Sequence, residues 1–187
     1  IIIYGGTFKS IKKLGYNCTE ISKYTGFKEM LDGRVKTLHP KIHAGILHDR
    51  QNTTHKKEMF KQKFPSIDLI IVNFYPFQKV VTESKNMKNI INNIDIGGPT
   101  LVRAAAKNFK NVAIITSKND YTSLIKELEK YNGKTSLKFR EIMSSKAFGL
   151  TAYYDSMIAH WFNSKLNIKF PDRKTIFGKK LKQLRYG

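Results

Sequence analysis

The sequence predicts an α/β fold, with a mostly parallel sheet that is covered by helices on both faces and is followed by C-terminal helices. Short apolar runs typical of strands alternate with segments whose apolar residues recur at helical spacing. The run at residues 68–74 (DLIIVNF) is nearly all apolar, as strands of parallel sheets are, because both of their faces are buried. Alternation of strands and helices favours parallel strands joined by crossover helices.

The same patterns place the individual elements along the chain. We expect strands at residues 1–4, 18–21, 68–74 and 111–116. A first helix carries Phe8, Ile11 and Leu14 on one face and ends at Gly15. Further helices are expected at residues 54–63, 88–93, 99–107 and 121–131, the last capped by Asp120. Residues 135–165 form one long helix or two abutting ones, and residues 167–182 look like a linker.

Length and cysteine content limit the class of protein. A chain of 187 residues is long enough for one domain with a hydrophobic core. Cys18 is the only cysteine, so no intrachain disulfide can form and we expect a reducing, cytoplasmic environment. The longest aliphatic run, residues 69–72, is too short to cross a bilayer. The chain begins on Ile1 without a methionine, and we interpret it as a piece of a longer polypeptide.

The charge balance raises the possibility of a nucleic-acid partner. The formal net charge is +20, from 34 Lys and Arg against 14 Asp and Glu, and basic surfaces gain affinity for phosphates by releasing counterions. The lysines are scattered, however, and aromatic residues do not interleave with them. A compositional bias explains the lysines as readily, so we expect no nucleic-acid partner.

Four motifs carry the chemistry: residues 33–40 (GRVKTLHP), 73–77 (NFYPF), 94–100 (IDIGGPT) and 104–108 (AAAKN). Each places a group that can bind an anion or move a proton beside residues that turn or stiffen the backbone. Three of them fall where loops leave the carboxyl ends of expected strands, which is where ligands bind in such sheets. Together they predict one active site for a phosphorylated small molecule.

Two segments could bind the phosphate, one outside the four motifs and one within the first of them. Gly5, Gly6 and Thr7 lie between an expected strand and helix, where glycines let the backbone approach a phosphate and the helix start offers free N–H groups. An ordinary strand–helix turn is the alternative. In an extended backbone, Arg34 and Lys36 point to the same side, and with the Thr37 hydroxyl they could converge on one dianion. The alternative here is a solvated basic loop.

The histidines at residues 39, 43 and 48, with Asp49 nearby, have the residue types of a metal site. Pro40 and Gly45 should interrupt any helix that would align them, and no acidic ligand lies within the spacing. Ligand type without fixed geometry is weak support. We therefore expect no metal.

Proton-transfer candidates come from the other three motifs. Tyr75 could donate a proton and Asn73 could hydrogen-bond an oxyanion, although an aromatic residue there could equally cap the core. Asp95 is the leading functional carboxylate, with a helix-capping role as its alternative. Lys107 shares a helical face with Thr100. An Asp95–Lys107 pair requires the loop to fold back beside the helix, or the helix to end early.

These residues resemble the IMP cyclohydrolase domain of the bifunctional purine-biosynthesis protein, whose other domain is AICAR transformylase. The resemblance covers nearly the whole chain and is most specific at residues 24–47, 73–77, 93–108 and 144–159. It implies a methylglyoxal-synthase-like α/β fold. It also implies that residues 1–165 form the cyclohydrolase domain without its first strand and phosphate loop, and that residues 166–187 form a linker and the start of the transformylase domain.

The resemblance also implies the chemistry: a cofactor-free closure of formyl-AICAR to IMP in a homodimer, with no membrane partner. By match to the family motifs, the catalytic positions are Lys36, Tyr75, Asp95 and Lys107. The substrate-binding positions are Gly5, Gly6, Thr7, Arg34, Thr37, Asn73, Ile96, Gly97 and Gly98.

One departure from the family concerns the phosphate loop. The chain has Ile3-Tyr4 where the family usually has Ser-Thr, which should weaken phosphate binding by about 1.5–3 kcal/mol per charged hydrogen bond lost. Three alternative functions stay open at this point: a methylglyoxal-synthase-type lyase, a regulatory phosphate-ligand domain of the same fold, and a basic nucleic-acid binder.

Overall fold

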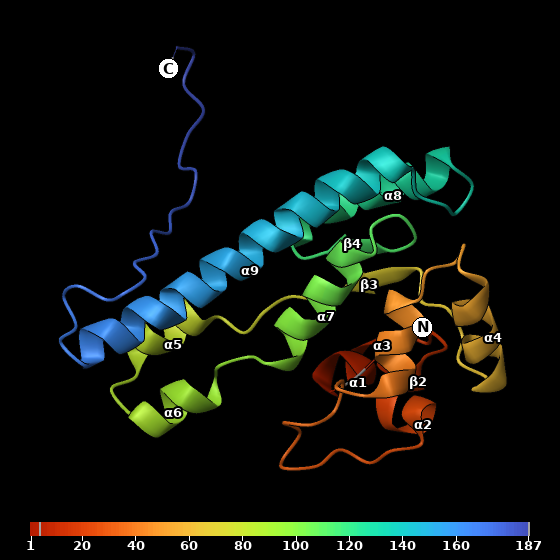
Figure 1. The fold of residues 1–187 in the computed structure, drawn as a ribbon, viewed down its shortest axis with the longest axis horizontal. Coiled ribbons are helices and arrows are strands. Elements are labelled where there is room, and N and C mark those ends of the chain that lie inside the picture. Colours follow the sequence, from red (N-terminus) through yellow and green to blue (C-terminus); the bar gives the residue numbers. More distant parts are fainter. Residues whose placement is uncertain (4, 187) are drawn as a thin grey trace.

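The computed structural model describes residues 1–3 and 5–186 and consists of short parallel strand pairs surrounded by helices (Figure 1). Strand β1 (Ile2–Ile3) pairs in parallel with β2 (Thr19–Glu20), and β3 (Leu69–Ile71) pairs in parallel with β4 (Ala113–Ile115). The predicted α/β class with parallel strands is confirmed. Within the described residues, the strands form two separate pairs rather than one continuous sheet.

Helices make up most of the chain. They are α1 (Gly5–Lys13), α2 (Ile21–Thr25), α3 (Pro40–Leu47), α4 (Thr53–Lys61), α5 (Phe77–Glu83), α6 (Met87–Asn92), α7 (Gly97–Lys107), α8 (Tyr121–Lys130) and α9 (Leu137–Lys165), with a 3-10 turn, η1 (Lys118–Asp120), before α8. The predicted helices agree with α1, α4, α6, α7 and α8 to within about two residues. The region at residues 135–165 contains one helix, α9, and not two abutting ones, while residues 166–186 contain neither helix nor strand. No helix in the described ranges combines the length and apolarity that a membrane span requires.

The expectation that Pro40 and Gly45 interrupt a helix is wrong. Pro40 occupies the first turn of α3, a favoured position because the N–H group that proline lacks has no partner there. Gly45 lies inside the same helix at a close backbone contact, where its carbonyl accepts a bond of 3.0 Å from the N–H of Ile67. A Cβ at position 45 would lie 2.9 Å from the carbonyl oxygen of Pro65. Glycine is therefore required by packing, and the helix continues through it.

Asp120 occupies the N-cap position of α8, as predicted, but it does not play the expected capping role. Its side chain makes no capping hydrogen bond. The residue is buried, at 7% exposure, and its carboxylate pairs with the ammonium of Lys146 on α9. Because a buried carboxylate needs a charged partner, Asp120 joins α8 to α9.

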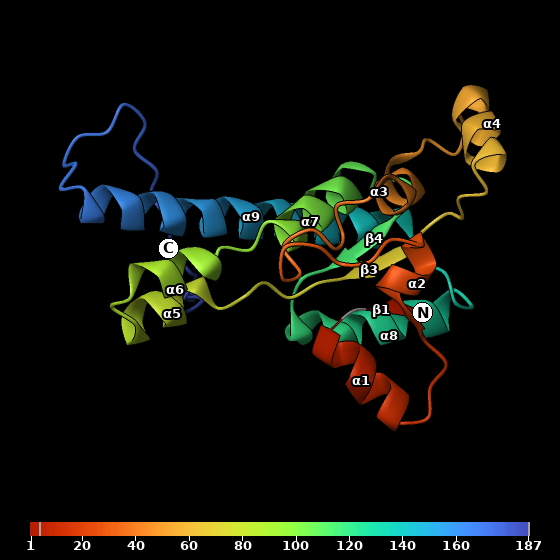
Figure 2. The same cartoon turned by 90° about the horizontal axis from the view of Figure 1, so that it is seen from below.

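The hydrophobic core lies where α7 and β4 meet the long helix α9, which runs along one side of the molecule (Figures 1 and 2). Ala105 and Ala106 of α7 are fully buried, and the Ser144 hydroxyl on α9 donates to the carbonyl of Ala106 at 2.8 Å. Strand β4 is buried throughout, as predicted. Strand β3 is less buried than predicted, with Ile71 at 48% exposure, although among the described residues each strand of this pair has only the other as its partner.

A second, smaller core joins the two short helices α5 and α6 to the C-terminal half of α9. Its buried members are Phe77, Ile90 and Tyr154, one from each helix. Figure 2 shows α5 and α6 together beneath this end of α9, away from α1 to α4. This cluster fixes the loops that precede and follow α5 and α6.

Two glycine substitutions test the role of Gly45. In Gly45→Ala, the new methyl group meets backbone at 2.9 Å, and we expect a loss of about 1–3 kcal/mol in the free energy of unfolding. Gly149→Ala is the matched control in α9, where a Cβ meets nothing within 4 Å. It should raise the free energy of unfolding by about 0.4–1 kcal/mol. Urea denaturation measures both, and a stabilised Gly45→Ala protein would contradict this account of α3.

Candidate functional site

The segment that contains Arg34, Lys36 and Thr37 lies against the N-terminus of α7. Thr37 is buried, at 6% exposure. A Cβ built on Gly97 would lie 2.6 Å from the Thr37 hydroxyl oxygen, so only glycine leaves room for this contact. Two motifs that are far apart in sequence therefore meet at the first turn of a helix, where N–H groups have no intrahelical partner.

Asp95 lies at the same turn and is held from three directions. Its carboxylate accepts a hydrogen bond of 2.8 Å from the N–H of Gly98 and another from the N–H of Tyr75. Its own N–H donates to the hydroxyl oxygen of Tyr154 at 2.8 Å. The bond from Gly98 shows that Asp95 does serve as a capping acceptor, although the N-cap position itself is Ile96. Capping and catalysis are compatible, because each uses the ionised carboxylate.

The environment of Asp95 changes its acidity. Burial raises the pKa of the Asp95 carboxyl, and the hydrogen bonds from the N–H groups of Gly98 and Tyr75 oppose that rise. A carboxyl group with a raised pKa is a stronger base once it is ionised. Titratable groups perturbed in this way are typical of functional sites.

The two cations of the first motif have separate partners. The ammonium of Lys36 pairs with the carboxylate of Glu29, while a guanidinium nitrogen of Arg34 donates to the amide oxygen of Asn92 at 2.7 Å. An antiparallel β-bridge between Met30 and Val35 closes the loop that contains Arg34. Arg34 therefore ties this motif to the end of α6, next to the Asp95 loop.

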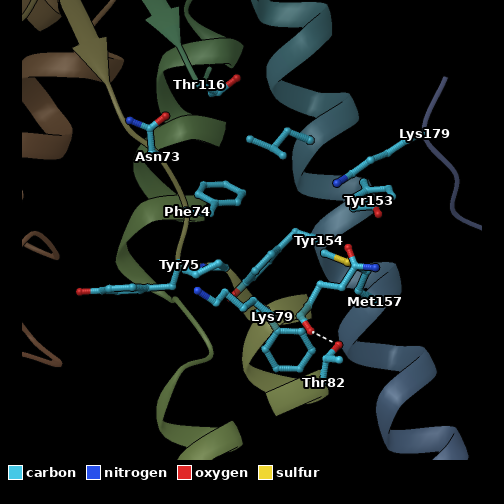
Figure 3. Close-up of a pocket in the computed structure, with 14 residues that line it drawn as sticks. Asn73, Phe74, Tyr75, Lys79, Thr82, Thr116, Tyr153, Tyr154, Met157 and Lys179 are labelled. Carbon is cyan, nitrogen blue, oxygen red and sulfur yellow. Dashed lines mark hydrogen bonds between the residues drawn. The ribbon is translucent and has the colours of Figure 1, made fainter. Parts of the chain in front are cut away.

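The segment at residues 73–77 contributes backbone and side chains in different directions. The N–H of Tyr75 faces Asp95, whereas its side chain is 60% exposed. Asn73 donates to the hydroxyl of Tyr121 across a long contact of 3.4 Å. Figure 3 shows the Tyr75 ring directed away from Phe74 and Tyr154, which lie on the side of α9. The phenol is thus accessible to a ligand, and its backbone is fixed.

Lys107 and the segment of Gly5, Gly6 and Thr7 lie apart from these contacts. Lys107 ends α7, about 15 Å along the helix axis from Gly97 at the usual rise per residue, and no ion pair joins it to Asp95 among the residues described. The pair of Asp95 and Lys107 would require α7 to end early or the Asp95 loop to fold back along it, and neither condition is met. Gly5, Gly6 and Thr7 form the exposed first turn of α1. Tyr4, the adjacent departure from the family, lies outside the described residues, as does Gly187.

A cavity of about 560 Å³ lies between residues 73–82 and α9 (Figure 3). Lys179, from the C-terminal segment, also lines it. Tyr75 and Tyr154 border this cavity, but Asp95 and Lys36 are not among its lining residues. The cavity is therefore next to the Asp95 cluster and does not enclose it.

The histidines do not form a metal site. Within residues 1–3 and 5–186, no group of three or more His, Cys, Asp or Glu side chains could hold a metal ion. The His39 ring accepts from the N–H of Lys41 as the N-cap of α3, and the His48 ring bonds the carbonyl of Ala44. Burial lowers the pKa of His43, whose hydrogen bond to the backbone of Thr37 opposes that change. These side chains support α3 and the Thr37 segment.

Sequence reasoning missed Tyr154. It lies in the motif at residues 144–159, where helical spacing marked only core positions. The available signal was a tyrosine in a core position where a phenylalanine would also fit. A buried hydroxyl requires a hydrogen-bond partner, so the tyrosine indicated that such a partner exists. Only the tertiary structure identifies that partner as Asp95.

Comparison with known proteins places the chain in a family. The model of the MGS-like domain matches residues 4–100, and that of the AICARFT/IMPCHase bienzyme matches residues 105–187. The chain is 44% identical over 187 residues to the bifunctional purine biosynthesis protein PurH of Bradyrhizobium diazoefficiens. It is 45% identical over 188 residues to the protein of the same name from Leptospira biflexa serovar Patoc.

Both alignments cover 100% of this chain but only 35% and 37% of the relatives, so the chain spans about a third of their length. The crystal structure of ForH superposes with a TM-score of 0.77 at 29% sequence identity, covering 87% of this chain and 84% of that one. We conclude that the chain belongs to the MGS-like domain family and that its second part matches the AICARFT/IMPCHase bienzyme, as its motifs indicated.

Proposed function

We propose that the chain is an IMP cyclohydrolase, which closes formyl-AICAR to IMP with loss of water. One observation carries the proposal: the Asp95 carboxylate, the Tyr75 backbone and the Thr37 hydroxyl converge on the N-terminus of α7. The names of the relatives, bifunctional purine biosynthesis proteins, support a role in purine biosynthesis. An anionic substrate fits the location, because a helix N-terminus favours negative charge.

The reaction needs few catalytic groups. The carboxamide nitrogen of formyl-AICAR attacks the formamido carbon and forms a C–N bond. The formyl oxygen then leaves as water, and its two protons come from the carboxamide and formamido nitrogens. Because both reacting groups belong to one molecule, a bound, folded substrate already has most of the required proximity. The protein must supply a base and donors to the oxygen.

We assign Asp95 as the base for the carboxamide proton. Its raised pKa supports this role, since burial makes the carboxylate more basic. Lys36 and the N–H groups at Ile96 and Gly97 stabilise the oxygen, while the N–H of Gly98 holds Asp95 itself. Tyr75, whose phenol is exposed, protonates the departing oxygen.

The remaining residues bind the substrate or complete the catalytic set. Arg34 and Thr37, together with Asn73 and the first turn of α1, hold the phosphate and ribose. Lys107 stays in the proposed catalytic set on the strength of its motif, although it lies at the opposite end of α7 from Asp95. Its contribution is therefore the sharpest question for mutagenesis.

The relatives also suggest the context of the domain. Residues 166–187 are proposed as a linker to a transformylase domain, supported by the absence of helix and strand over residues 166–186 and by relatives about three times as long. We further propose a cytoplasmic homodimer that uses no cofactor.

Two substitutions test the catalytic set. Asp95→Asn removes the base but keeps one oxygen that can accept from the N–H of Gly98. Lys107→Ala removes one of the two lysines in the proposed catalytic set. Each should lower the rate of IMP formation from formyl-AICAR by about 100-fold or more, since general acid–base catalysis typically contributes at least about that factor. Lys110→Ala, an exposed lysine three residues further on, should keep the parent rate. If Asp95→Asn closes the ring at the parent rate, the proposed mechanism is wrong.

The pH dependence of stability provides a test without substrate. A carboxyl group whose pKa is raised on folding stabilises the protein fully below its unfolded value of 3.8, and this contribution is lost as pH rises through the raised pKa. The free energy of unfolding of Asp95→Asn minus that of the parent should therefore increase between about pH 4 and pH 7. Asp172→Asn, an exposed charge in the C-terminal segment, should show no such trend. Urea denaturation at several pH values measures the difference, and a constant difference would contradict the effect of burial.

A further inference from the structure

We propose that Tyr154 is a positioning residue for the ring closure: from α9 it holds the backbone of Asp95 so that the carboxylate stays at the N-terminus of α7. This inference rests on the proposed function for its catalytic consequence. The tether itself depends only on the contacts that follow.

The contact between the two residues is direct. The N–H of Asp95 donates to the Tyr154 hydroxyl oxygen at 2.8 Å. The carboxylate of the same residue is held by the N–H groups of Gly98 and Tyr75. Asp95 is thus fixed at its backbone by α9 and at its side chain by α7 and the 73–77 segment. Loss of either attachment frees one end of the residue.

The ring of Tyr154 reaches the second site loop as well. It forms edge-on contacts with Phe74, at 5.1 Å between ring centroids, and with Phe77, at 6.1 Å. Figure 3 shows it extending from α9 toward the segment that carries Phe74 and Tyr75. The loops that carry Asp95 and Tyr75, two of the proposed catalytic residues, therefore contact one side chain. That side chain belongs to a helix of 29 residues that is packed in the main core.

The hydroxyl is what distinguishes Tyr154 from an ordinary core residue. Tyr154 is 2% exposed and shares its cluster with Phe77 and Ile90, so a phenylalanine would fill the space without burying a polar atom. Burying a hydroxyl is unfavourable unless it is hydrogen-bonded. Burial raises the pKa of Tyr154, and the hydrogen bond from the N–H of Asp95 opposes that rise. The hydroxyl therefore serves the Asp95 loop and not the core.

The neighbouring Tyr153 supplies a matched control. Its ring contacts Phe177 at 5.4 Å and lies under the ammonium of Lys179 at 5.4 Å, both in the C-terminal segment. Removing its hydroxyl makes the same chemical change one residue away, on a side chain that contacts a different part of the chain.

The experiment compares Tyr154→Phe with Tyr153→Phe. Both keep the aromatic ring, so both should fold with the parent circular dichroism spectrum. In Tyr154→Phe, we expect faster hydrogen exchange at the Asp95 amide, measured by NMR. For formyl-AICAR closure, we expect kcat to fall by about tenfold or more with KM within twofold, because a misplaced base slows the chemical step. Tyr153→Phe should match the parent in all three measurements.

Two results would overturn the inference: parent-like exchange at the Asp95 amide in Tyr154→Phe, or an equal fall in kcat in both variants. If the parent chain itself fails to close formyl-AICAR, the proposed function is wrong. The exchange measurement still decides whether Tyr154 tethers Asp95. The two failures are thus distinguishable.

Discussion

The packing of α7 against α9, β4 and α3 is the constraint on which the candidate site depends. Its contact face is built from small side chains, with Ala105 and Ala106 fully buried. Alanine lets neighbouring elements approach closely, and the bond from Ser144 to the carbonyl of Ala106 fixes α9 against the helix. A helix held this firmly has a fixed N-terminus. The loops around that N-terminus can then be positioned by a few hydrogen bonds each.

At Asp95, the ionised form that the proposed reaction uses is the form that burial destabilises. Burial disfavours its ionised form, and the N–H groups of Gly98 and Tyr75 only oppose that effect. A residue selected for stability alone would be neutral or exposed. Proteins tolerate such costs where a reaction requires them, because the rest of the fold provides the stability. Here that support comes from the core around α7 and from the aromatic cluster around Tyr154.

Individual ion pairs hold particular side chains in place, although the chain as a whole is strongly basic. The chain carries +20, and several acidic side chains are used to hold particular cations in place, such as Glu29 on Lys36 and Asp120 on Lys146. The Asp120 pair also shows why a local pattern can mislead. An aspartate before a helix looks like a cap, yet a lysine on another helix is the stronger partner for a buried carboxylate.

The sequence by itself determined the class of fold, the order of most elements, the four motifs and the family. These depend on periodicity and on residue type over a few positions, which a chain displays without folding. It did not reveal that α3 continues through Gly45 or that β3 is partly exposed. Both depend on which segments pack nearby.

Only the tertiary structure decided which motif residues meet. It placed Thr37 on Gly97 and the Tyr75 backbone on Asp95, and left Lys107 at the far end of α7. It also joined Asp95 to Tyr154, 59 positions away. Contacts at such separations result from the packing of whole elements, and no local pattern of residues specifies them.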